Sequence, residues 1–124
     1  MQRLTQNPSQ AYRRVDLDAR IEASRAADLT RICLEEVISA LGQCLLALEL
    51  TPEKPPREAL GRAHGIALWL ARSVAPDNPL HKQLVLFYGG LAASIRRNLG
   101  QADIAELERV RRDFTDLLAA AHGD

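Results

Sequence analysis

The sequence predicts an all-α protein: an antiparallel up-down-up-down four-helix bundle preceded by a short N-terminal arm. Hydrophobic residues make up 47% of the 124 residues but aromatic residues only 4%, so the core must be aliphatic, a composition that favours helix over sheet. Apolar residues recur every three or four positions in four segments, as on one face of a helix. Short connections between these segments place successive helices antiparallel in a single domain.

The first 20 residues carry few apolar side chains and include Pro8, so we expect a partly ordered arm over 1–20 and the bundle domain over 21–124. The first helix is predicted from about Ile21 or Ser24 to Leu50, where a proline-rich segment stops it. Its apolar arc covers half the cylinder, which implies packing against two neighbours. The arc comprises Leu29, Cys33, Leu34, Val37, Ala40, Leu41, Cys44, Leu45 and Leu48.

Two further helices are predicted over about 57–75 and 80–99, separated by the Pro-Asp-Asn-Pro segment 76–79. The former has a heptad seam of Leu60, Ala63, Ala67, Leu70 and Val74. The latter has a face of Leu80, Leu84, Phe87, Leu91, Ile95 and Leu99. We expect Gly100 to end this helix with a positive φ, which glycine adopts readily.

The fourth helix is predicted to begin at Asp103, whose side chain can cap its free backbone N–H groups. Glu106 lies three residues later, as in a capping box. The predicted buried stripe comprises Ile104, Leu107, Val110, Phe114, Leu117 and Ala121.

Several residues of the two middle helices depart from this pattern and project away from the predicted core. A helical glycine costs about 1 kcal/mol relative to alanine, so glycines here call for an explanation. We interpret them as an apolar trough that binds a partner chain, with Leu68 and Trp69 as anchors. Two alternatives are that Trp69 packs beneath the N-terminal arm, or that the glycines are merely tolerated. The predicted trough comprises Gly61, Gly65, Leu68, Trp69, Leu86, Gly90 and Ala93.

The composition excludes several functional classes. Sixteen basic residues balance 16 acidic ones, so the basic excess of a nucleic-acid-binding protein is missing. No apolar run is long enough to span a membrane, and the N-terminus lacks the apolar stretch of a secretion signal. Cys33 and Cys44 are separated by about 16 Å along one helix, too far for a disulfide. We therefore expect reduced thiols and a cytoplasmic protein.

The sequence predicts neither an enzyme nor a metal or cofactor site. The histidines His64, His81 and His122 are widely spaced, without the spacing of a helical metal site. One alternative is a histidine phosphotransfer domain, which is also a four-helix bundle but pairs its histidine with a downstream Lys-Gly. The segment after His64 has no lysine, and Lys82 follows His81 directly.

Several segments resemble the FliS family of flagellar secretion chaperones, in order and over nearly the whole chain. Gln10-Ala11-Tyr12 is similar to the family's N-terminal Ala-Tyr, and the segments 29–34, 60–66 and 87–91 are similar to its conserved helical motifs. Asp103, Leu107 and Val110 match an Asp-x3-Leu-x2-Val pattern. The chain departs from the family at Leu34, Glu36 and Gly90, and lacks its late Arg-x-x-Trp.

The resemblance implies a chaperone that binds the disordered C-terminal segment of flagellin in the cytosol, preventing premature polymerisation and aiding export. It further implies that the client segment wraps around the bundle and that the arm, through Tyr12, covers part of the binding surface. A co-chaperone or an export-gate protein would be an additional partner. The alternative is a generic helical adaptor or assembly factor with another partner.

Overall fold

The protein is all-helical over residues 8–121, the part of the chain that the computed structural model describes. Its helices are α1 (Pro8–Leu50), α2 (Arg57–Arg72), α3 (His81–Gly100) and α4 (Ile104–Ala121). The chain divides after Thr30 into two compact units, so α1 contributes its first part to one unit and its last part to the other. His122 and the start of the predicted arm lie outside the described residues.

The first unit differs from the predicted arm, because α1 already begins at Pro8 rather than near Ile21 or Ser24. Local forces explain this early start. Proline suits the first position of a helix, and the segment that follows is rich in alanine. Asp16 and Arg20 also form an ion pair of 2.6 Å at the favourable i, i+4 spacing. Side chains 11–29 are exposed, so burial does not account for the first part of α1.

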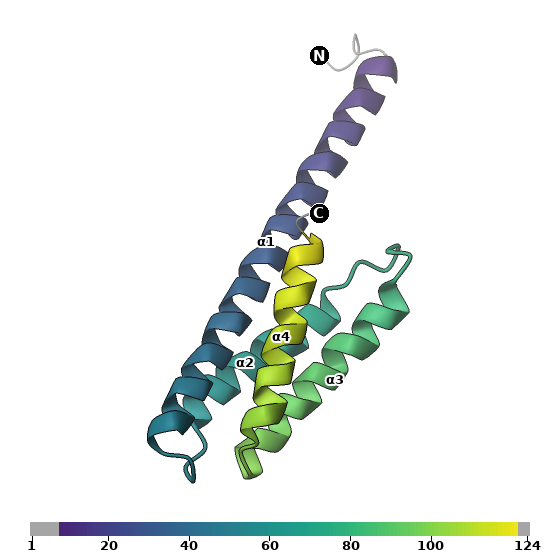
Figure 1. Ribbon diagram of the computed structural model, residues 1–124. Coiled ribbons are helices and arrows are strands. Elements are labelled where there is room, and N and C mark those ends of the chain that lie inside the picture. The colour runs from purple at the N-terminus through teal and green to yellow at the C-terminus, as the bar shows by residue number, and fades with distance from the viewer. Residues whose placement is uncertain (1–7, 122–124) are drawn as a thin grey trace. The chain divides into compact units, whose positions relative to one another are not determined.

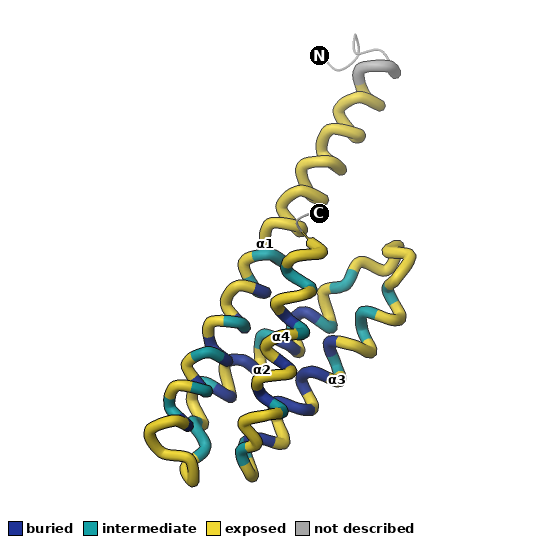
Figure 2. The backbone as a smooth tube through the Cα atoms, in the orientation of Figure 1, coloured by how far each residue is buried: buried dark blue, intermediate teal, exposed yellow. Residues whose placement is uncertain are grey.

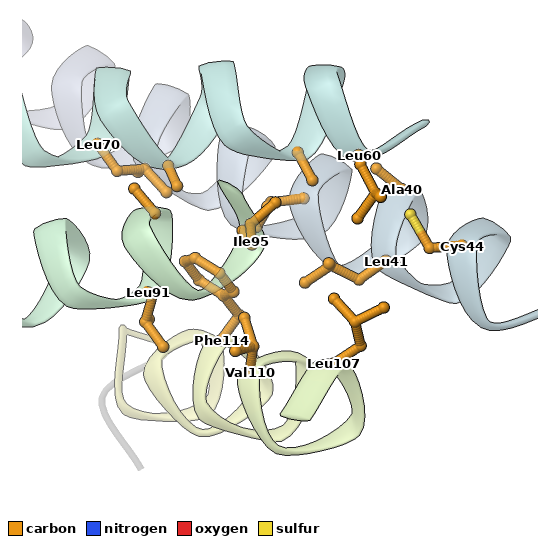
Figure 3. Packing of buried hydrophobic residues seen from close by; sticks show 14 of the residues in the cluster. Ala40, Leu41, Cys44, Leu60, Leu70, Leu91, Ile95, Leu107, Val110 and Phe114 are labelled. Atoms are coloured by element: carbon orange, nitrogen blue, oxygen red, sulfur yellow. The ribbon is translucent and has the colours of Figure 1, made fainter. Parts of the chain in front are cut away.

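The second unit is the predicted four-helix bundle, formed by the last part of α1 together with α2, α3 and α4. The chain reverses direction at each connection between helices (Figure 1). Buried residues lie on the inward faces of these helices (Figure 2). All four helices contribute to one aliphatic core around Phe114, which is fully buried (Figure 3). Burying a side chain of this size contributes about 1.5–3 kcal/mol.

The core face of α3 differs from the predicted one. Tyr88 is buried and its ring stacks on Phe114 with the ring centroids 6.5 Å apart, whereas Phe87 is 42% exposed. Leu80 and, on α4, Ile104 were also predicted to be buried and are exposed. The observed core line of α3 has heptad spacing and includes one polar side chain, Asn98. It comprises Leu84, Tyr88, Leu91, Ile95 and Asn98.

The α3–α4 turn confirms one half of the predicted capping box. The Glu106 N–H donates to Asp103 Oδ1 at 3.1 Å, so Asp103 caps α4 as expected. The Asp103 N–H, however, donates to the buried Asn98 side chain instead of to Glu106. Gly100 was expected to end the helix with a positive φ. It is instead the last helical residue of α3, and its φ is not positive. Asn98 therefore organises the turn that the glycine was predicted to make.

Candidate partner-binding surface

Most residues of the predicted partner-binding surface are exposed on two neighbouring helices of the bundle. On α2, Gly61, Gly65 and Leu68 form an exposed stripe that lies away from the buried seam. On α3 the exposed stripe comprises Leu86, Gly90 and Ala93. We call these two sets the α2 stripe and the α3 stripe. Because α2 and α3 pack against each other, both stripes belong to the same helix pair.

The glycines in these stripes have no structural role in the packing of the described chain. A Cβ added to Gly61, Gly65 or Gly90 would meet nothing within 4 Å. Gly42 on α1 is a contrasting case, because its Cβ would lie 3.3 Å from the guanidinium of Arg111. That guanidinium donates through Nε to the Ile38 carbonyl at 3.1 Å, so Gly42 leaves room for a contact between α1 and α4. The stripe glycines instead leave open space over α2 and α3.

Apolar side chains border this open space. Leu86 is 67% exposed and Phe87, which the sequence assigned to the core, is 42% exposed beside it. Leu68 is 36% exposed, and Trp69 is partly buried against the core. Exposed apolar groups on the same helices as backbone left bare by glycine suit the close approach of another chain. Phe87 is thus an exposed apolar side chain of α3 that the sequence did not predict.

Tyr12, the residue carried over for a gating role, lies on the first part of α1 and is 76% exposed. It belongs to the first of the two units, whereas the α2 and α3 stripes belong to the second.

The residues capable of covalent chemistry are placed unfavourably for it. Burial raises the pKa of the Cys44 thiol to about 11, and burial together with Glu36 raises the pKa of Cys33. Both thiols are therefore protonated near neutral pH, which makes them poor nucleophiles. His64 is half-buried, and a ring nitrogen of His81 lies 3.1 Å from the Ala75 carbonyl oxygen. Over residues 8–121, histidine, cysteine and carboxylate side chains form no group that could hold a metal ion.

One feature that the sequence did not reveal is a groove of about 540 Å³ between the end of α1 and the start of α2. The sequence marked Thr51–Pro56 only as the end of a helix. The groove could have been suspected from the basic residues near these prolines, Lys54, Arg57 and Arg62. The groove itself depends on the folded chain, because Ala47 on α1 and Ala59 on α2 both line it.

None of the helices in the described part of the chain has a stretch apolar enough to cross a membrane. Comparison with known proteins adds no relative: no family model, no curated protein and no solved structure matches the chain.

Proposed function

We propose that the protein is a cytoplasmic export chaperone that binds the disordered C-terminal segment of flagellin and catalyses no reaction. By holding this segment the protein prevents premature polymerisation and delivers flagellin for flagellar export. The assignment to flagellar export is based on the sequence resemblance to the FliS family. The binding role is based on the exposed surface of the bundle.

The observation that carries the binding role is the open space over the α2 and α3 stripes. Three glycines there, Gly61, Gly65 and Gly90, each cost helix stability and relieve no contact within the described chain. Their absent side chains let a second backbone approach α2 and α3 closely, while Leu68 and Leu86 provide apolar contact. This is the mode in which an amphipathic helix lies in an apolar groove.

A disordered client suits this kind of surface. A segment that folds on binding loses conformational freedom, so it must bury a large apolar area to offset that loss. The exposed apolar side chains Leu68 on α2 and Leu86 and Phe87 on α3 offer separate contacts rather than one deep pocket. The client then gains helical structure as it lies along the bundle.

Isothermal titration calorimetry with the purified C-terminal segment of flagellin from the same organism tests the proposal. We expect saturable binding with a negative heat-capacity change, because apolar surface is buried. Full-length flagellin should also co-purify with the protein, and flagellin that lacks this segment should not. Absence of binding at high concentrations of both partners, or equal capture of the truncated flagellin, would refute the function.

A further inference from the structure

A groove of the bundle that shares no residue with the α2 and α3 stripes has the properties of a peptide-docking site. The α1–α2 groove, of about 540 Å³, lies where the two helices are joined. Its apolar lining consists of small side chains, Ala47, Pro55, Pro56 and Ala59. Prolines and alanines leave room for a bulkier aliphatic side chain of another molecule, and the prolines restrict the backbone around it.

The charges around the groove favour an acidic occupant. Lys54, Arg57 and Arg62 line it, against a single carboxylate from Glu58. Arg62 is positioned across the groove by a bond of 2.8 Å from its guanidinium to Gln43 Oε1 on α1. A guanidinium carries five N–H donors, so this bond leaves donors for a carboxylate.

The backbone at the same place adds to this preference. α2 begins at Arg57. The N-cap residue, Pro56, makes no side-chain hydrogen bond to the first backbone N–H groups of the helix. The positive end of the helix dipole therefore faces the part of the groove that Arg57 and Glu58 line. The dipole only reinforces the effect of the three basic side chains, which by themselves make the charge of the groove positive.

We propose that the α1–α2 groove docks an acidic peptide segment of a partner protein, one that alternates carboxylates with leucine-like side chains. The carboxylates lie against Lys54, Arg57 and Arg62, and an aliphatic side chain lies on Ala47 and Ala59. This site shares no residue with the α2 stripe, so it is distinct from the client surface proposed above.

Fluorescence anisotropy with labelled synthetic peptides tests the inference on the full chain. The probe is a short peptide of glutamate, leucine and alanine, compared with one in which lysine replaces glutamate and one in which serine replaces leucine. We expect the acidic probe to bind at least about tenfold more tightly than either comparison peptide, and more weakly as salt is added. Equal binding of the three peptides to the wild-type protein would overturn the proposal.

Charge reversal locates the site. The variant Lys54→Glu with Arg57→Glu should bind the acidic probe about tenfold less tightly, since both cations are removed and like charges introduced. Its matched control, Lys82→Glu with Arg96→Glu, makes the same change in net charge on exposed positions of α3. The control should keep wild-type affinity for the probe. Equal loss in both variants, or no loss in the first, would show that the groove is not the binding site.

Discussion

Asn98 is a fully buried polar side chain in an otherwise aliphatic core, and its hydrogen bonds join α3 to α4. Its Nδ2 donates to the Ser94 carbonyl at 2.8 Å and to Glu106 Oε1 at 3.0 Å. Its Oδ1 accepts the Asp103 N–H at 2.6 Å. One side chain thus satisfies the backbone of the turn and fixes the carboxylate that follows it.

We predict that Asn98→Ala destabilises the fold by about 2–3 kcal/mol, because it removes the buried bonds and leaves the Asp103 N–H without its acceptor. Urea unfolding followed by circular dichroism measures the change in free energy. Gln101→Ala, an exposed substitution in the same turn, is the control and should have an effect of about 0.5 kcal/mol or less. A similar loss in both variants would contradict the role of Asn98.

Glu106 makes the stability of the same turn depend on pH. The hydrogen bond from Arg97 lowers the pKa of Glu106, and the bond from Asn98 lowers it further, against the opposite effect of burial. A carboxyl whose pKa is lower in the folded state stabilises the fold above its unfolded pKa, which is about 4.3. That stabilisation is lost as the pH falls through the lower, folded value.

We therefore predict that the wild type loses more stability than Glu106→Gln when the pH is lowered through this acidic range. Urea unfolding of both proteins at a series of pH values measures the difference, which should shrink as the pH falls. Glu108→Gln controls for the same change in net charge on α4. Parallel curves for wild type and Glu106→Gln would show that the folded protein does not favour the ionised carboxylate.

These residues also mark where prediction from sequence failed. Phe87 was predicted to lie in the core because it is apolar and is spaced three or four residues from Leu84 and Leu91, as on one face of a helix. The observed face instead includes Tyr88 and the polar Asn98, neither of which belonged to the predicted face. Stacking on Phe114 and the hydrogen bonds of the turn stabilise these two residues, and the partners lie on α4 or in the turn that precedes it. Such long-range contacts are not visible in the pattern of a single helix.

At the scale of the helix, the residues proposed to bind a partner on α2 and α3 are different from the residues that form the core. The buried seam of α2 is made of Leu60, Ala63, Ala67 and Leu70, whereas Gly61 and Gly65 lie on its other side. Substitutions at these glycines should therefore leave the core unchanged. Any loss of binding can then be assigned to the surface.

We predict that Gly65→Leu and Gly90→Leu each weaken binding of the flagellin segment by about tenfold or more while the fold becomes no less stable. Leucine has a higher helix propensity than glycine, by up to about 1 kcal/mol, and its Cβ enters open space. Gly65→Ala is the matched control: it should raise stability similarly and fill much less of the surface. Calorimetry and urea unfolding measure the two effects, and wild-type affinity in the leucine variants would exclude this surface.

The helix boundaries show what could be predicted from the sequence and what could not. Prolines and turn residues located α2, α3 and α4 to within a few residues, because these residues break helices wherever they stand. The start of α1 was missed since its first part is helical through local propensity and lacks the buried stripe on which the prediction relied. The α1–α2 groove was missed because two distant helix positions, Ala47 and Ala59, come together only in the folded chain.

At the scale of the whole molecule, the second unit combines a closed core with open outer faces. The core includes the largest buried side chains of all four helices, so the bundle has its own source of stability. Exposed apolar side chains such as Leu86 and Phe87 contribute little to that core. The proposed client would therefore add stability to a domain that is already folded.

We predict that the flagellin C-terminal segment raises the free energy of unfolding of the protein in proportion to the logarithm of its concentration. At a free concentration of 100 times the dissociation constant, linkage gives about 2.7 kcal/mol for a segment that binds only the folded bundle, as proposed. Thermal unfolding at several segment concentrations measures this. The Gly65→Leu variant should gain far less at the same concentrations, although its own core is intact. An unfolding midpoint that stays constant as the segment is added, with calorimetry showing saturation, would mean that the segment does not discriminate between folded and unfolded chains. The bundle would then not be the surface it recognises.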